Sequence, residues 1–121
     1  MNDLTMREMA VLLVVDLDQI CSTIHGRTVF KNQLLRAASS VGANIHEAKY
    51  AQSNADFISK LEITLKEIYE TEYWLEILYK VNAIDKSTYT AQQNTCGRIR
   101  RKLIASVKTV KAKQNQTEVK P

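Results

Sequence analysis

The segment LLRAASSVGANIHEA, from Leu34 to Ala48, combines a regular apolar pattern with a dense cluster of small side chains. Six of the seven residues from 37 to 43 are alanine, serine or glycine. Small side chains let two helix backbones approach closely, whereas a glycine inside a helix costs about 1 kcal/mol relative to alanine. We therefore expect Gly42 to lie against a neighbouring helix or a neighbouring subunit.

The segment ETEYWLEIL, from Glu70 to Leu78, places the carboxylate of Glu72 in the middle of an apolar pattern. A buried carboxylate must be paired or neutral. Candidate partners lie along one side of the first segment: Arg36, Ser40, Asn44 and Glu47. Arg36 also has Glu67 and Glu70 as candidate partners, including across a subunit boundary. We interpret these groups as a structural polar network that fixes helix register rather than as a catalytic acid and base.

The rest of the chain contains few residues that interrupt helices. Among 121 residues there are 3 glycines and one proline, which is the last residue. Apolar residues recur at gaps of three and four in four segments, at about 5–24, 28–51, 54–82 and 86–113. Short connections place successive helices antiparallel, so the predicted fold is an all-α, up-down-up-down four-helix bundle over 1–113. Residues 114–121 are expected to form a polar tail.

Capping residues support these boundaries. Gly26 is expected to end the first helix, and Thr28 and Asp85 to cap the second and the fourth. Ser53 with Asp56 is an acidic variant of the capping box. The four predicted core stripes are Met6, Met9, Leu13, Leu17, Ile20 and Ile24; Phe30, Leu34, Ala37, Val41, Ile45 and Ala48; Phe57, Leu61, Leu65, Ile68, Glu72, Leu75 and Tyr79; and Tyr89, Gln92, Cys96, Ile99, Leu103, Val107 and Val110.

Two helices carry more apolar residues than a single bundle requires. The third has a second row at Ile63, Glu67, Glu70, Trp74, Ile77 and Val81, and the first adds Val11, Leu12 and Val15. A helix that is apolar on two sides has a second partner, and we therefore predict a homo-oligomer. The residues assigned to its interface or to the polar network are Arg36, Asn44, Glu47, Ile63, Glu67, Glu70, Glu72, Trp74 and Ile77.

Positive charge is concentrated in the last third of the chain. Residues 1–85 hold 8 basic and 12 acidic side chains, whereas residues 86–121 hold 9 basic and one acidic. The predicted nucleic-acid-binding residues all lie on the fourth helix: Arg98, Arg100, Arg101, Lys102, Lys108, Lys111 and Lys113. Such a row suits the phosphates of RNA or DNA. The alternatives are ordinary solvated charge that stabilises a helix C-terminus and an anionic membrane surface, which is disfavoured because the opposite face must form the bundle core.

Other functional classes find little support in the sequence. No glycine-rich phosphate loop or nucleophile motif is present, and His25, His46, Cys21 and Cys96 lack metal-ligand spacing. We therefore expect no enzymatic activity, no metal and no cofactor. The chain contains no apolar run of about 18 residues, so no membrane span is expected, and no secretory signal is recognisable. A cytoplasmic location follows as an expectation.

Three segments, LLRAASSVGANIHEA at residues 34–48, SNADF at residues 53–57 and LKEIYETEYWLEIL at residues 65–78, resemble the bacterial four-helix-bundle family of 23S rRNA intervening-sequence proteins. This resemblance extends from about Thr5 to Lys113. It implies similarity to the accessory variability determinant of diversity-generating retroelements, a homopentameric barrel that binds nucleic acid and a reverse transcriptase. Positions that match the family pattern, and are therefore interpreted as structural or interface residues, are Arg36, Asn44, Glu47, Glu67, Glu72 and Trp74.

Two hypotheses of function follow. The first is a non-enzymatic homo-oligomer, a pentamer by resemblance, that binds RNA or DNA through the basic fourth helix. The second is a protein-interaction scaffold that docks a polymerase, such as a reverse transcriptase, or a ribosomal component without touching nucleic acid.

Overall fold

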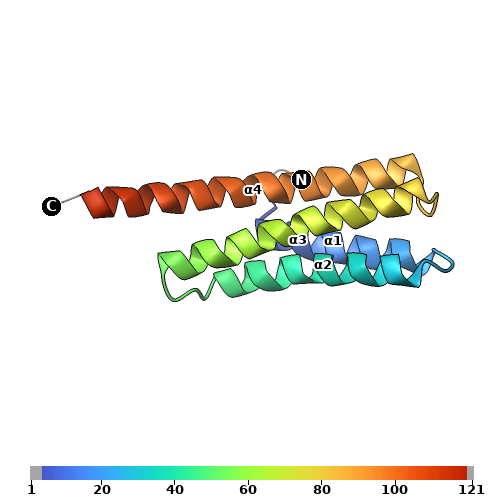
Figure 1. Cartoon of the computed structure of the whole chain (residues 1–121), viewed down its shortest axis with the longest axis horizontal. Coiled ribbons are helices and arrows are strands. Elements are labelled where there is room, and N and C mark those ends of the chain that lie inside the picture. Colours follow the sequence, from blue (N-terminus) through green and yellow to red (C-terminus); the bar gives the residue numbers. More distant parts are fainter. Residues whose placement is uncertain (1–3, 120–121) are drawn as a thin grey trace.

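The computed structural model describes residues 4–119, with side chains for residues 4–115. It contains four helices, α1 (Met6–Ser22), α2 (Thr28–Ala48), α3 (Asn54–Lys80) and α4 (Lys86–Val119). They run alternately up and down, and the C-terminal part of α4 projects beyond the other three helices (Figure 1). Within residues 4–119, each helix packs against two neighbours: α2 contacts α1 and α3, and α4 contacts α3 and α1. The predicted all-α, up-down-up-down bundle is therefore confirmed.

The first, third and fourth helices begin at side-chain caps. Thr5 Oγ1 accepts a hydrogen bond from Glu8 N at 3.1 Å, and Asp85 Oδ1 accepts one from Thr88 N at 2.7 Å. The capping box at Ser53 is reciprocal, because Ser53 Oγ accepts from Asp56 N at 3.0 Å and Asp56 Oδ2 accepts from Gln52 N at 3.1 Å. These backbone donors lower the pKa of both the Asp56 and the Asp85 carboxyl groups.

The start of α2 differs from the expectation. Thr28 is the first helical residue rather than the cap, and Arg27 occupies the cap position with a left-handed φ of 56° and no side-chain cap bond. Gly26 also has a positive φ, of 70°, but α1 already ends at Ser22, with Thr23 as its C-cap. The short connection reverses the chain with two consecutive left-handed residues, which the capping pattern alone did not reveal.

The predicted ends of the helices need small corrections. The first three helices end two or three residues earlier than expected, at Ser22, Ala48 and Lys80. The fourth continues to Val119, so the polar tail predicted from residue 114 is helical as far as the structure describes it. Glycine and proline are missing between residues 113 and 119, and polarity by itself does not end a helix. Residues 120 and 121 of that predicted tail lie outside the described residues.

The middle of each predicted stripe of α1, α2 and α4 is buried, whereas seven of their residues are only half-buried: Met6, Ile20, Ile24, Phe30, Tyr89, Val107 and Val110. In addition, α3 is rotated relative to the expectation. Its buried residues are Ile58, Leu61, Thr64, Ile68, Thr71, Leu75 and Leu78. Phe57, Leu65, Glu72 and Tyr79, which were predicted for this stripe, are only half-buried. The buried threonine hydroxyls are satisfied within the helix, because Thr64 Oγ1 donates to Lys60 O at 2.7 Å and Thr71 Oγ1 donates to Glu67 O at 2.8 Å.

The small residues of α2 divide between the core and the surface, since Ser39 and Ala43 are exposed. Ala37 and Ala38 are fully buried, and a Cβ added at Gly42 would lie 3.8 Å from Ala10 Cβ. Gly42 therefore lies against a neighbouring helix, as predicted. The distance is an ordinary van der Waals contact, so the packing within one chain also leaves room for alanine.

We predict that Gly42→Ala raises the free energy of unfolding by about 0.5–1 kcal/mol, because alanine is the better helix former and fits the space. Chemical denaturation followed by circular dichroism measures the change. The control is Gly26→Ala, which should destabilise because Gly26 has a φ of 70°. Destabilisation by Gly42→Ala would show that this position is closely covered by something other than α1.

Candidate nucleic-acid interface

The rotation of α4 is set by its apolar stripe. Cys96, Ile99 and Leu103 are fully buried, and their spacing of three and four residues gives the helix one inward side. The cations stand between these positions, so they point sideways or outward. Arg101, Lys102, Lys108, Lys111 and Lys113 are exposed, whereas Arg98 and Arg100 are half-buried.

Two of the seven predicted cations pair with carboxylates of α3. Arg100 Nε lies 3.2 Å from Glu72 Oε1, and its Nη2 lies 3.4 Å from Oε2, so the guanidinium faces both carboxylate oxygens. Lys111 Nζ lies 3.5 Å from Glu62 Oε2. These cations connect α4 to α3, and much of their charge is compensated locally.

The remaining cations differ in their surroundings. Arg98 and Lys113 have interaction partners of their own. Arg101, Lys102 and Lys108 are exposed and form no salt bridge among the residues that the structure describes. We refer to these three residues as the open cation row. Arg101 and Lys108 are seven residues apart and share one side of α4, whereas Lys102 lies about 100° around the helix from Arg101. The three together contribute most to the uncompensated positive field of α4.

A glycine lies beneath the arginines of α4. Gly97 is buried, and a Cβ added to it would lie 3.2 Å from Arg101 Nη1 and 3.4 Å from Arg100 Nη2. The missing side chain therefore lets both guanidinium groups fold back along the helix. The sequence signal for this arrangement, a glycine followed by arginines three and four residues later, was not used in the prediction.

The polar network of Glu72 differs from the prediction. Glu72 lies on the seam between α3 and α4, where Arg100 is its partner, and Gln93 Nε2 donates to the backbone oxygen of Glu72 at 3.0 Å. The side chains of α2 do not supply this partner. Arg36 pairs instead with Glu70, with 3.0 Å between Nη2 and Oε2, which was one of its two predicted alternatives.

The other predicted network and interface residues are dispersed over the seam between α2 and α3. Asn44 donates to Ser40 O within its own helix at 3.0 Å, and Glu47 and Ile63 are exposed. Trp74 is half-buried and stacks on Phe30 of α2, with ring centroids 6.0 Å apart. Glu67 and Ile77 are half-buried, and Glu67 Oε2 is buried without a hydrogen-bond partner. A single connected network is therefore not formed by the described side chains of one chain.

The extra apolar row of α1 is uncovered. Val11, Leu12 and Val15 have exposed fractions of 47%, 43% and 46%. Three neighbouring aliphatic side chains that remain half-exposed are a surface that a partner could bury.

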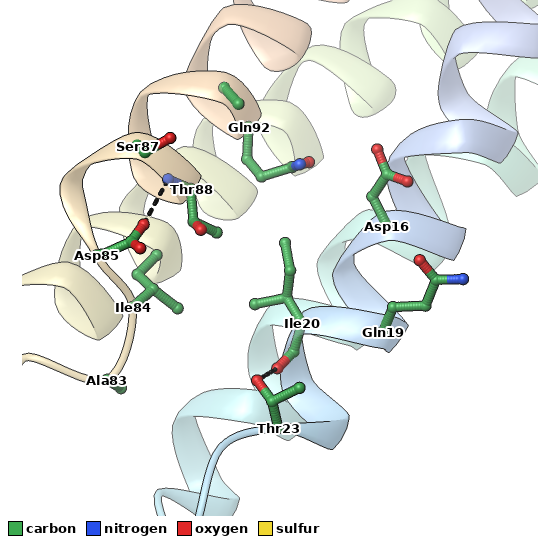
Figure 2. A pocket seen from close by; sticks show the side chains of 11 residues that line it. Asp16, Gln19, Ile20, Thr23, Ala83, Ile84, Asp85, Ser87, Thr88 and Gln92 are labelled. Carbon is green, nitrogen blue, oxygen red and sulfur yellow. Dashed lines mark hydrogen bonds between the residues drawn. The ribbon is translucent and has the colours of Figure 1, made fainter.

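A cleft of about 570 Å³ separates the end of α1 from the start of α4. Its polar lining includes Asp16, Thr23, Asp85, Thr88 and Gln92, and Figure 2 shows the side chains of α1 and α4 facing each other across it. The hydrogen bond from Thr88 N already engages Asp85. Because the lining supplies two carboxylates and no cation, this cleft does not extend the basic surface and is poorly suited to phosphate.

The described part of the chain also bears on metal sites and on membrane spans. Residues 4–119 contain no group of three or more histidine, cysteine, aspartate or glutamate side chains placed to hold a metal ion. None of the helices described is long and apolar enough to cross a membrane.

Comparison with known proteins places the chain in a family. The family model described as 23S rRNA-intervening sequence protein matches residues 2–105. The chain belongs to this family. A solved structure from Bacteroides thetaiotaomicron, described as a protein with unknown function from the S23 ribosomal protein family, is 37% identical to it. That match covers 86% of this chain and 99% of the other, with a TM-score of 0.81. No curated protein matches the chain.

The two cysteines of this intervening-sequence family member are core residues. The pKa of Cys96 is raised to about 12, mainly by burial and secondarily by the nearby charge of Glu72, while Arg100 opposes the shift. Burial also raises the pKa of Cys21. Both thiols therefore remain protonated near neutral pH and are shielded from reagents.

We predict that neither thiol reacts with Ellman's reagent in the folded protein at about pH 8, and that both react in denaturant. Because the folded pKa of Cys96 lies above its ordinary value of 9.0, its stabilising contribution is complete below pH 9.0 and is lost as the pH rises toward about 12. Denaturation titrations should therefore show a shallower alkaline loss of stability in Cys96→Ala than in the wild type. An equal loss in both proteins would contradict this assignment.

Proposed function

We propose that this protein is a non-enzymatic homo-oligomeric bundle that binds the phosphate backbone of RNA or DNA through α4. The observation that carries the proposal is the open cation row, Arg101, Lys102 and Lys108, on a helix segment without an acidic residue between Asp85 and Glu118. Exposed cations that lack carboxylate partners are available to replace the counterions of a nucleic acid.

One copy of this row makes a weak site. Three exposed charges in water interact with phosphates over a Debye length of about 8–10 Å, so a single chain should bind weakly and without sequence preference. An oligomer repeats the row, and simultaneous contacts then raise the overall affinity. The uncovered apolar row of α1 supports such an assembly, and the family resemblance suggests five copies.

A protein-interaction scaffold remains the alternative. It is favoured by the compensation of Arg100 and Lys111 by Glu72 and Glu62, which removes two of the seven predicted cations from the open surface. In that case a polymerase or a ribosomal component would dock on the bundle, and complex formation would survive nuclease treatment.

We predict that the wild type shifts short RNA and DNA in gels at low salt and loses affinity steeply toward physiological salt. The variant Arg101→Gln/Lys102→Gln/Lys108→Gln should lower the slope of log affinity against log salt by about three, because each lost phosphate contact removes close to one unit. Circular dichroism should show an unchanged fold, since these side chains are exposed.

The matched control removes the same charge elsewhere, as Arg7→Gln/Lys49→Gln/Lys80→Gln, whose three side chains are also exposed. This control variant should retain most of the wild-type slope of log affinity against log salt. No shift by the wild type even at low salt would refute nucleic-acid binding, and equal losses in both triple variants would refute the assignment to α4.

We also predict that light scattering at micromolar concentration gives a multiple of the 13.8 kDa chain mass. The variant Val11→Gln/Leu12→Gln/Val15→Gln should shift the mass toward that of one chain while remaining helical, because it removes only exposed apolar surface. A wild-type mass of 13.8 kDa would contradict the oligomer.

A further inference from the structure

A second groove, of about 540 Å³, runs along the outer seam between α3 and α4. Tyr69 and Tyr73 line it from α3, while Gln93 and Asn94 line it from α4. The exposed fractions of Tyr69 and Tyr73 are 52% and 55%, so about half of the surface of each residue is accessible to solvent. Exposed aromatic rings in a groove are unusual enough to need a functional explanation.

The geometry of these tyrosines suits stacking. They are four residues apart on one helix, so they lie on the same side, about 6 Å apart along the axis. The Tyr73 ring contacts Trp74 edge to face, with centroids 5.0 Å apart at an angle of 74°. Trp74 in turn stacks on Phe30. Tyr73 is thus held by packed neighbours, which lowers the entropy that a stacked ligand would remove.

The same seam continues into the cations of α4. Asn94, Gly97, Arg101 and Lys108 recur at gaps of three, four and seven residues, so they share one side of the helix. The space above Gly97 lets the Arg101 guanidinium fold back along α4, toward the end of the groove where Asn94 lies. Aromatic faces and uncompensated positive charge therefore follow one another along a single surface.

The lining of this groove, like that of the first cleft, supplies two carboxylates, Glu72 and Glu76, and no cation. Phosphates are therefore expected outside the groove, along α4 beyond Asn94. Glu72 is compensated by Arg100, and Glu76 is the remaining carboxylate of the lining. A carboxylate repels phosphate, but it accepts hydrogen bonds from the amino groups of bases. The groove near Tyr73 therefore favours bases, and the surface of α4 near Arg101 favours phosphates.

We propose that Tyr69 and Tyr73 stack against unpaired bases of a single-stranded nucleic acid whose phosphates lie along Arg101 and Lys108. The proposal rests on the nucleic-acid-binding function proposed above and specifies its ligand as single-stranded. A duplex hides the faces of its bases, so it can use the cations but not the tyrosines. Stacking on aromatic side chains is tolerant of sequence because every base has a flat face.

Fluorescence anisotropy with a labelled single strand and with a blunt-ended, two-stranded duplex of equal phosphate number tests this proposal. The wild type should bind the single strand more tightly. Tyr69→Leu/Tyr73→Leu should lower affinity for the single strand about tenfold or more and leave affinity for the duplex unchanged within about twofold. The variant Tyr69→Phe/Tyr73→Phe keeps both aromatic rings and should bind the single strand with an affinity close to that of the wild type.

Tyr50→Leu is the matched control, because Tyr50 is 67% exposed and lies at the connection between α2 and α3; it should change neither affinity. Tyr73 contacts Trp74, so the double leucine variant also removes a packing contact within the protein. If that variant loses helicity, the single variant Tyr69→Leu tests the stacking role instead. Equal binding of both ligands by the wild type, or equal losses for both in the leucine variants, would overturn the stacking role while nucleic-acid binding stands. Binding of neither ligand would instead refute the proposed function itself.

Discussion

The burial of the apolar stripe of α4 is the constraint on which the charged surface depends. Fully burying a side chain such as Ile99 or Leu103 contributes about 1.5–3 kcal/mol, whereas a partly exposed ion pair contributes about 1 kcal/mol or less. The stripe therefore sets the rotation of α4, and the ion pairs adapt to it. Once Cys96, Ile99 and Leu103 face inward, the arginines and lysines between them have no choice but to face sideways or outward.

Apart from Arg98 and Lys113, which have interaction partners of their own, rotation then places the cations of α4 in two settings. Arg100 and Lys111 face α3 and meet Glu72 and Glu62, so they help to align two antiparallel helices along their lengths. The open cation row faces away from the core and retains its charge. The number of cations in a sequence therefore overestimates the electrostatic field of a surface when some of those cations pair with carboxylates of the same chain.

The seams on either side of α3 have different chemistry. At the seam with α2, Trp74 stacks on Phe30, and Arg36 and Glu70 form an exposed ion pair. Toward α4, a half-buried ion pair lies beside an aromatic groove. With 34 residues against 27 in α3 and 17 in α1, α4 continues beyond the end of this second seam, and its C-terminal part projects past the other three helices (Figure 1).

The sequence by itself determined the helices, their order and the bundle, because three-four spacing, capping residues and scarce glycine and proline are local signals. It also indicated that Gly42 lies against a neighbouring helix, although at ordinary contact distance, and it located the excess positive charge of α4. Only the tertiary structure decided which carboxylate meets which cation, because the partner of Glu72 depends on the rotation and axial register of α3 against α4. The same dependence explains the burial of Thr64 and Thr71, whose hydroxyls are satisfied inside the helix, and the groove at Tyr69 and Tyr73. The buried set of α3 and the predicted stripe both follow gaps of three and four residues, so spacing allows either, and only packing against the other helices decides between them.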